Sequence, residues 1–366
     1  MAHWAEMPAR NAAWCWLLLS VAACAGVNKG SDPADSGSAF DIALPDGPPA
    51  DAGCASGQSE ARRVPVDIIF AIDQSESMDG EIALVKKNIN KLTDLLGATK
   101  LDYRVIMIAR PGPDAFGVCI PPPLGADGCG DNLPRFKRSA QEVLSNDALA
   151  LYLKTYDSTD PLVAWAKYIR VDSFKAFVPI TDDNATQPPP SPYWQTFDRE
   201  ILKRGAGTFG TAKDRNYAFY PLIGAASADA TVKCSTEVVS EGPEYSELVK
   251  LTKGKHYSIC ATDYGPIFVS MANEISTRVL CTLPVPVPPK GEAIDPSKVN
   301  VSFNKSSGPP PVELLQDNAP CEGGANGWQF NADKTKILLC GDACKAVRDD
   351  PTGRVDVVFG CKTRVR

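Results

Sequence analysis

The sequence predicts an α/β fold: a doubly wound, mostly parallel sheet with helices on both faces, followed by a small disulfide-rich, β-rich C-terminal module. Short apolar runs rich in β-branched residues recur along the chain, and segments with a helical spacing of apolar residues lie between them. This alternation is typical of a parallel sheet that is covered on both faces. The composition changes after residue 281, where closely spaced prolines and four cysteines appear.

The strands and helices of the first domain are expected within residues 64–281. The run over 66–72 (VDIIFAI) is apolar with a single acid, which predicts a strand buried on both faces. Apolar residues at a helical spacing, closed by Gly97, predict a helix over 80–97. Further strands are expected at 102–109, 136–143, 174–180, 217–226 and 256–260, and helices at 145–156, 161–170, 193–204, 245–252 and 265–280.

The N-terminus predicts export. An apolar run over 12–23 follows Arg10, is too short to span a bilayer and has the form of a signal-peptide core. Its end, Val-Ala-Ala-Cys, resembles the lipobox of bacterial lipoproteins, in which Cys24 would be acylated and become the first residue. Ordinary signal cleavage near Ala23 is the alternative.

The segment after Cys24 refines this expectation. Ala25 and Gly26 follow rather than aspartate, which in Gram-negative lipoproteins favours the outer membrane. We therefore expect a signal peptide at 1–23 and a protein of the bacterial cell envelope that contacts the membrane only through its lipid anchor. Residues 24–63 are rich in Gly, Ser, Pro, Asp and Ala, which predicts a flexible tether.

Ten of the twelve cysteines remain after Cys15 and Cys24, and an even number in an oxidising compartment predicts five disulfides. A Cys119–Cys129 bridge would clip a loop without secondary structure of its own. A Cys54–Cys281 bridge would tie the entry of the domain to its exit, because chain termini of compact domains often lie close together. Cys234 and Cys260 are the next expected pair. The connectivity of the other four is not deducible, and zinc is the rival interpretation for them.

Oxygen donors follow the strand at 66–72. Asp73, Ser75 and Ser77 alternate in DQSES, just past the carboxyl end of a strand, where open α/β sheets bind ligands. Hard oxygen donors without His or Cys suit Mg²⁺ or Ca²⁺ better than zinc or copper. Turn and helix-capping chemistry is the simpler explanation of such residues. The pattern resembles the metal-ion-dependent adhesion site (MIDAS) of von Willebrand factor A (VWA) domains.

The resemblance implies two further ligands. VWA domains supply an aspartate after a later buried strand, usually in Thr-Asp-Gly, and Asp182 in Ile-Thr-Asp fits this role, with Asp183 where the family usually has glycine. They also supply a hydroxyl from a loop between the two motifs. Ser145, which would also cap the helix at 145–156, is favoured, and Ser158 or Thr159 is the alternative. The predicted ligands of Mg²⁺ (or Mn²⁺ or Ca²⁺) are Asp73, Ser75, Ser77, Ser145 and Asp182.

The expected function is binding rather than catalysis. The net charge of −6 and the lack of a basic block give no reason to expect nucleic acid. A GxGxxG match at 205–210 follows a predicted helix instead of a strand, so it is interpreted as a loop. The resemblance implies that a partner protein supplies an acidic side chain to the metal. A metal-free structural or assembly lipoprotein, with the fold and the cysteine-rich tail (282–366) as scaffold, is the alternative, and a metal-assisted hydrolase is the least favoured.

Overall fold

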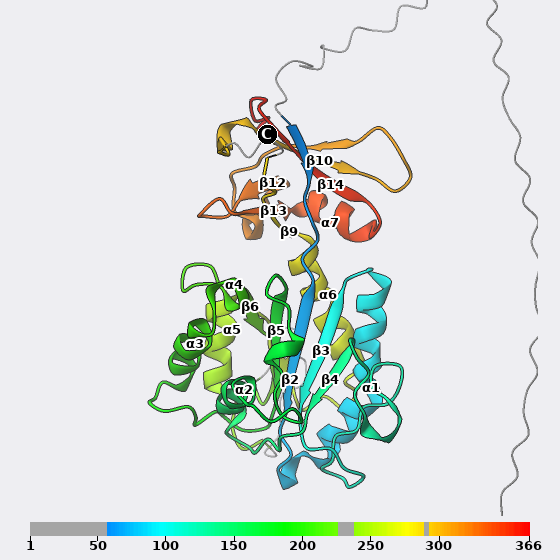
Figure 1. Cartoon of the computed structure of the whole chain (residues 1–366), viewed down its shortest axis with the longest axis vertical. Helices are drawn as coiled ribbons and strands as arrows, with labels where there is room; N and C mark the ends of the chain where they lie inside the picture. The colour runs from blue at the N-terminus through cyan, green and yellow to red at the C-terminus, as the bar shows by residue number, and fades with distance from the viewer. Residues whose placement is uncertain (1–56, 226–237, 289–292) are drawn as a thin grey trace, which may run out of the picture. The chain divides into compact units, whose positions relative to one another are not determined.

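The computed structural model describes residues 57–225, 238–288 and 293–366 (Figure 1). The predicted signal peptide, Cys24, Cys54 and Cys234 lie outside the described residues. Among the described residues, no helix has both the length and the apolar character needed to cross a membrane.

A parallel sheet of seven strands forms the α/β part of the chain, which confirms the predicted α/β class (Figure 1). Its strand order is β4-β3-β2-β5-β7-β8, and β6 also pairs with β5. Every paired strand in this sheet is parallel to its neighbour. The strands are β2 (Val66–Ile72), β3 (Tyr103–Ile108), β4 (Phe136–Ser139), β5 (Phe174–Ile180), β6 (Tyr217–Phe219), β7 (Leu222–Ile223) and β8 (Tyr257–Ser258).

Helices cover both faces of this sheet because its central strand points apolar side chains both ways. All seven residues of β2 are buried, as predicted. Ile68, Phe70 and Ile72 join the core cluster that contains residues of α1 and α6, whereas Ile69 and Ala71 join the cluster that contains residues of α2, α3 and α5. These helices are α1 (Asp79–Ala98), α2 (Ala148–Tyr156), α3 (Tyr193–Lys203), α5 (Pro243–Thr252) and α6 (Gly265–Leu280), and α4 (Ala206–Phe209) is a single turn.

The carboxyl ends of β2 and β5 lie side by side, and this positions the candidate site. The two strands pair in register from Val66↔Phe174 to Ile72↔Ile180. A proline near the end of β5 does not disrupt it. The N–H groups of Lys175 and Thr181 donate to Asn216 O and Leu222 O. Pro179 lies between these two residues and faces the gap between β6 and β7. A backbone hydrogen bond from residue 179 is not required there, so proline is tolerated.

Two predicted elements differ most from the structure. Residues 161–170 do not form an α-helix and contain only the 3₁₀ turn Ala166–Tyr168. Side-chain contacts hold this segment instead: the buried Trp165 indole donates to Thr155 Oγ1 at 2.8 Å. The predicted strand at 217–226 is interrupted at Pro221, which lacks an N–H group, and forms the short strands β6 and β7.

A buried ion pair closes the amino ends of the central strands. The Asp67 side chain is fully buried on β2, and its carboxylate accepts hydrogen bonds from Arg170 N, Nε and Nη2 at 2.7, 3.0 and 2.6 Å. Ser173 Oγ donates to the same carboxylate. Lys175, also buried, donates from Nζ to the backbone oxygens of residues 170, 171 and 173. These partners satisfy charges that would otherwise be costly to bury.

Two antiparallel sheets and a helix form the rest of the structure. One sheet has the order β1-β14-β10-β11 and the other β12-β13-β9. The strands are β1 (Gly57–Glu60), β9 (Thr282–Pro284), β10 (Val299–Asn304), β11 (Val312–Leu314), β12 (Gly327–Phe330), β13 (Lys336–Cys340) and β14 (Arg354–Phe359), and the helix is α7 (Gly341–Asp349). The short turns are η1 (Glu76–Met78), η2 (Asp127–Cys129), η3 (Ala166–Tyr168), η4 (Pro296–Lys298) and η5 (Cys321–Gly323).

Strand β1 corrects the predicted tether. Residues 57–60 were expected to be part of a flexible linker, but they pair with β14 from Gly57↔Phe359 to Glu60↔Asp356. The carboxylate of Asp356 accepts from Gln58 at 2.6 Å and from Asn304 at 2.7 Å, so one buried acid joins three strands. The C-terminal sheet therefore includes residues from before the α/β part.

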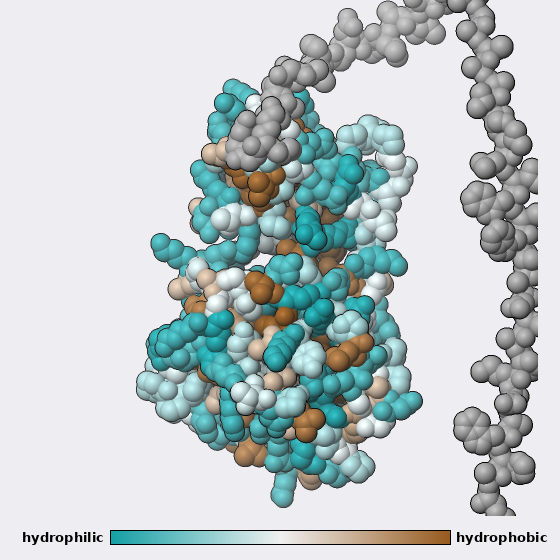
Figure 2. All heavy atoms as spheres, in the orientation of Figure 1, coloured by the Kyte–Doolittle hydropathy of each residue, from teal (hydrophilic) through white to brown (hydrophobic). Residues whose placement is uncertain are grey.

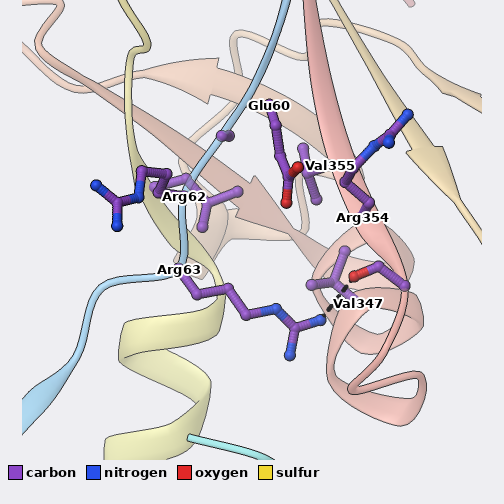
Figure 3. A pocket seen from close by; sticks show the side chains of 9 residues that line it. Glu60, Arg62, Arg63, Val347, Arg354 and Val355 are labelled. Carbon is purple, nitrogen blue, oxygen red and sulfur yellow. Dashed lines mark hydrogen bonds between the residues drawn. The ribbon is translucent and has the colours of Figure 1, made fainter. Parts of the chain in front are cut away.

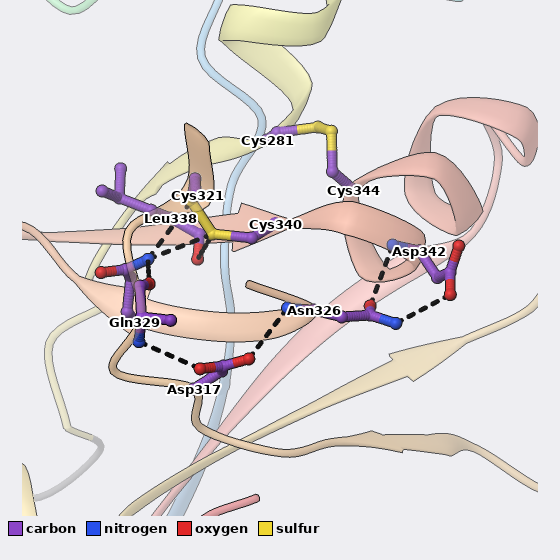
Figure 4. Close-up of a disulfide and its surroundings, with 10 residues drawn as sticks. Cys281, Asp317, Cys321, Asn326, Gln329, Leu338, Cys340, Asp342 and Cys344 are labelled. Atoms are coloured by element: carbon purple, nitrogen blue, oxygen red, sulfur yellow. Dashed lines mark hydrogen bonds between the residues drawn. A yellow bond between two sulfur atoms is a disulfide. The ribbon is translucent and has the colours of Figure 1, made fainter. Parts of the chain in front are cut away.

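The described disulfides confirm one predicted pair and contradict another. Cys119 and Cys129 are bonded, as predicted. Cys281, at the end of α6, is bonded to Cys344 of α7 and not to Cys54 (Figure 4). The expectation that chain entry and exit are joined there was wrong. In the tail, Cys321 bonds Cys340 and Cys361 is in the disulfide form. Cys260, between β8 and α6, is also in the disulfide form.

Candidate metal site

Asp73 lies at the carboxyl end of β2, between two neighbouring segments. Its N–H donates to Ile180 O at 3.0 Å, and it forms an isolated parallel bridge with Val143. The side chain is fully buried. Its Oδ1 accepts from Ser75 N at 2.9 Å and its Oδ2 from Thr181 Oγ1 at 2.7 Å. Both carboxylate oxygens are thus held in place.

Gln74 fixes the loop that follows. Its side chain donates to the backbone oxygens of Arg110 and Phe116 at 2.9 and 2.5 Å and accepts from Arg110 N at 2.6 Å. Gln74 is 5% exposed, so these bonds replace the water that it loses. The loop with the two predicted serine ligands is anchored to the segment after β3.

Ser75 and Ser77 present neighbouring hydroxyls. Ser75 precedes the 3₁₀ turn η1, and its Oγ lies 3.3 Å from Ser77 Oγ. Ser77 is exposed and Ser75 is half-buried. Two hydroxyl oxygens this close together, next to the Asp73 carboxylate, are suitable ligands for a hard cation.

Asp182 lies two residues beyond β5 and carries an unsatisfied oxygen. Its side chain is 5% exposed, and its Oδ1 is buried without a hydrogen-bond partner among the described residues. A buried carboxylate oxygen without a protein partner is costly, and a water molecule or a cation would satisfy it. The charge of Asp182 also acts on Asp73. The structure therefore brings both predicted carboxylates together.

Ser145 lies next to the site, but its contact is made by the backbone. Ser145 O accepts from Thr181 Oγ1 at 3.1 Å. The prediction that Ser145 caps the following helix was wrong, because α2 starts at Ala148 and Asp147 is its N-cap residue. The alternative ligands, Ser158 and Thr159, follow the C-terminus of α2, which is about 13 Å from its start at 1.5 Å per residue. Of the three candidates, Ser145 is the one that contacts the site.

Thr181 is a central residue that the sequence prediction missed. Its hydroxyl donates to Asp73 Oδ2 and accepts from Asp183 N at 3.1 Å, and its side chain is buried. It joins the end of β5 to the end of β2 and to the segment before α2. The sequence feature that could have identified Thr181 was its hydroxyl, in the residue directly before Asp182.

Asp183, which replaces the usual glycine of the VWA pattern, fits the local backbone. It does not have a positive φ angle, so a side chain is tolerated there without strain. Its Oδ1 accepts from Asn184 N at 2.7 Å. The aspartate at a position where the VWA resemblance predicts glycine is therefore accommodated by this loop.

The site is strongly acidic. Burial raises the pKa of the Asp73 carboxyl, hydrogen bonds from Ser75 and Thr181 oppose this shift, and the charge of Asp182 adds to it. Burial also raises the pKa of Asp147, and the charge of Asp73 adds to that shift. Like charges held together in a poorly solvated place favour a bound cation. The carboxylates and hydroxyls here are the donor set that Mg²⁺, Mn²⁺ and Ca²⁺ take.

The number of charged side chains limits how a metal ion could be bound at this site. Among the described residues, no group of three or more His, Cys, Asp or Glu side chains has an arrangement that could hold a metal ion. An ion at this place would therefore depend on Asp73 and Asp182 together with hydroxyl oxygens and water. The unsatisfied Asp182 Oδ1 fits such an ion.

Two cavities lie elsewhere. One, of about 240 Å³, is lined by Glu60, Arg63, Arg354 and neighbours, and Arg63 Nη2 donates there to Gly353 O at 2.9 Å (Figure 3). The other, of about 460 Å³, includes Arg170 near the amino ends of the strands. Neither contains a predicted metal ligand. The visible face is mostly hydrophilic, with scattered hydrophobic side chains (Figure 2).

Comparisons with known proteins assign no family. No family model and no curated protein matches the chain. Among solved structures, the pilus adhesin SpaC from Lactobacillus rhamnosus GG in its open conformation is similar, with a TM-score of 0.32 and 13% sequence identity over 85% of this chain. The match covers 41% of that protein, so this chain spans less than half of its length.

Proposed function

We propose that this protein is a VWA-type binding protein whose site at the ends of β2 and β5 binds a divalent cation, and a partner protein through it. The single observation that carries the proposal is Asp182 Oδ1, a buried carboxylate oxygen without a partner among the described residues, beside the buried Asp73. The parallel sheet and the DQSES loop after its central strand support it.

In this proposal each residue of the chain has a defined task. Asp73 and Asp182 supply the charge, while Ser75 and Ser77 supply hydroxyl oxygens from the exposed side. Thr181 holds the Asp73 carboxylate in one orientation. The ion, Mg²⁺ or a similar hard cation, would provide an open coordination position for an acidic side chain of the partner. The signal segment and Cys24 support an exported, lipid-anchored protein of the bacterial cell envelope.

A metal-free structural or assembly role is the second candidate. It is favoured by one observation: both oxygens of Asp73 already accept a hydrogen bond within the chain. In that role the α/β part and the cysteine-rich part would be a scaffold, and the acids would be turn residues. The two candidates differ in what a divalent cation does to the protein.

Thermal unfolding with Mg²⁺, Mn²⁺ or EDTA separates them. A cation that binds only the folded protein raises the unfolding midpoint as its concentration rises. Asp73→Asn should abolish this shift. Asp79→Asn is the matched control, because Asp79 is an exposed acid at the start of α1 and carries the same charge. It should keep the shift. A wild type whose midpoint is the same in Mg²⁺, Mn²⁺ and EDTA would contradict the metal proposal and favour the scaffold.

A further inference from the structure

The larger cavity, of about 460 Å³, lies at the amino ends of the parallel strands, at the edge of the sheet opposite the candidate metal site. The segments that lead into β2, β3 and β5 line it. Its volume lies within the range of small-molecule sites, about 300–1,000 Å³. Six of its ten lining residues are charged, and four of these are basic: Arg62, Arg63, Lys100, Arg170, Asp102 and Asp172. In a chain with a net charge of −6, this is a local excess of positive charge.

The acids of the cavity leave part of this positive charge unpaired. Asp102 forms an ion pair with Arg170 Nη1 at 2.6 Å, and the other nitrogens of Arg170 donate to the buried Asp67. Arg170 is thus neutralised by two carboxylates. Asp172, which is exposed, is the remaining acid of the cavity, against three remaining basic side chains. The cavity therefore keeps a net positive charge.

Arg63 is a half-buried cation whose hydrogen bonds are incomplete. Its Nη2 donates to Gly353 O at 2.9 Å in the smaller cavity, which Arg63 also lines (Figure 3). Its Nη1 is buried and has no hydrogen-bond partner among the described residues. Burial lowers the pKa of Arg63, and the charges of Asp350 and Glu60 oppose this shift without reversing it. An anion or a water molecule would satisfy a buried guanidinium nitrogen of this kind.

Lys100 occupies a helix-end position where glycine is usual. It is the first residue beyond the C-cap of α1, with a φ of 56°. Its N–H donates to Gly97 O at 3.0 Å, and the N–H of Leu101 donates to Leu96 O at 3.3 Å. In this Schellman arrangement glycine is favoured, because a side chain is strained at positive φ. Lys100 is exposed, and among the described residues it has no ion pair or side-chain hydrogen bond, so its ammonium group is available to a ligand.

We propose that this cavity binds a small molecule or headgroup that carries a phosphate group, held by Arg62, Arg63 and Lys100. Arg62 is exposed and, like Lys100, has no ion pair or side-chain hydrogen bond among the described residues. A guanidinium fork matches the geometry of phosphate oxygens, and a lysine ammonium adds a compact point charge. A phosphate monoester carries a charge of about −1.5 to −2 at pH 7, which balances three basic side chains and one acid. None of these residues is a predicted metal ligand, so the inference does not depend on the metal function.

The test is calorimetric titration of the full protein with glycerol 3-phosphate, in EDTA and at constant ionic strength. EDTA keeps metal ions away from the protein, so the phosphate cannot bind through a cation. Saturable one-to-one binding is expected. Phosphatidylcholine vesicles with and without phosphatidic acid form the second arm, and binding that requires phosphatidic acid would identify a lipid headgroup as the source of the phosphate. Binding of neither glycerol 3-phosphate nor phosphatidic acid vesicles would overturn the inference.

Lys100→Gly is the decisive variant, because it removes the ammonium group and also relieves the strain at positive φ. Its unfolding midpoint should be close to that of the wild type, so weaker binding cannot be caused by misfolding. The affinity should fall about 5-fold, the upper end for an exposed charge pair. Arg62→Gln combined with Lys100→Gly should lower the affinity about 25-fold, if the two contributions add.

Lys334→Gly is the matched control. Lys334 is also an exposed lysine at positive φ, with a φ of 58°, but it does not line the cavity. This variant has the same net charge as Lys100→Gly and should bind like the wild type. If Lys100→Gly binds as tightly as the wild type, then Lys100 serves only the helix end, where a positive charge is favourable, and the inference is wrong. Equal losses in both variants would also overturn it. Asp73→Asn should leave phosphate affinity unchanged, so the metal proposal and this one can fail separately.

Discussion

Replacing Asp182 with asparagine should change stability in opposite directions with and without metal. In EDTA the wild type holds two buried carboxylates, and the charge of Asp182 raises the pKa of Asp73. Asp182→Asn removes this repulsion, and its amide can donate to a neighbouring carboxylate. One pKa unit of such repulsion is worth about 1.4 kcal/mol. Since the repulsion is one of several contributions, the variant should be between unchanged and about 1 kcal/mol more stable.

In the presence of a divalent cation the order should reverse. At a concentration 100 times the dissociation constant, a cation that binds only the folded wild type adds about 2.7 kcal/mol. For a unit that spans residues 50–366, with an unfolding entropy of about 2.1 cal/mol/K per residue, 1 kcal/mol corresponds to about 1.5 °C, so the wild-type midpoint should rise by about 4 °C. Asp182→Asn loses one of two carboxylate ligands and should show little of this rise. The wild type then becomes the more stable protein.

Thermal unfolding followed by circular dichroism measures both effects, with Asp79→Asn as the control for the change in charge. The control should follow the wild type under both conditions. If Asp182→Asn destabilises the protein by the same amount in EDTA and in Mg²⁺, then Asp182 is only a structural residue and its unsatisfied oxygen does not bind a cation.

Three further predictions concern the frame around the site. Arg170→Ala should cost about 3–5 kcal/mol in urea unfolding, because it leaves the buried Asp67 carboxylate without its main partner; a loss below 1 kcal/mol would contradict the buried ion pair. Burial lowers the pKa of Lys175 to about 8, below its unfolded value near 10.5. Between these two pH values the unfolded chain binds more protons than the folded chain, so the free energy of unfolding should rise as the pH increases from about 8 to 10.5. Lys175→Met should remove this rise, and an identical pH profile in the variant would refute the assignment. The double variant Cys281→Ala/Cys344→Ala opens a loop with a sequence separation of 63 and should lower the free energy of unfolding by about 2–4 kcal/mol; an unchanged urea midpoint would show that the bridge does not restrict the unfolded chain.

The elements that local sequence decides were predicted well. The strand at 66–72 and the helix at 265–280 coincide with β2 and α6, because a continuous apolar run and a regular helical spacing each have one favourable arrangement. Strand β1 was missed because Gly57–Glu60 has no apolar residue and becomes a strand only through its partner β14. The segment 161–170 was missed because tertiary contacts of Trp165 override its helical pattern.

In the candidate site, too, features set by local sequence were predicted and features set by tertiary contacts were missed. Asp73 and Asp182 could be placed on one edge of the sheet because each follows a buried strand. The role of Thr181 depends on a contact between residues 108 positions apart, which sequence spacing does not reveal. The unsatisfied Oδ1 of Asp182 is visible only in three dimensions, since it depends on which partners are missing around it.

The pairing of β1 with β14 determines the order in which the protein can be completed. Glu60 and Asp356 are partners in the sheet, yet the whole α/β part lies between them in the chain. During synthesis β1 emerges first and must wait until the last strand has been made. The α/β part, whose strands all lie within residues 66–258, can form in the meantime. Removal of residues before 64 would thus leave the parallel sheet intact and deprive the C-terminal sheet of an edge strand.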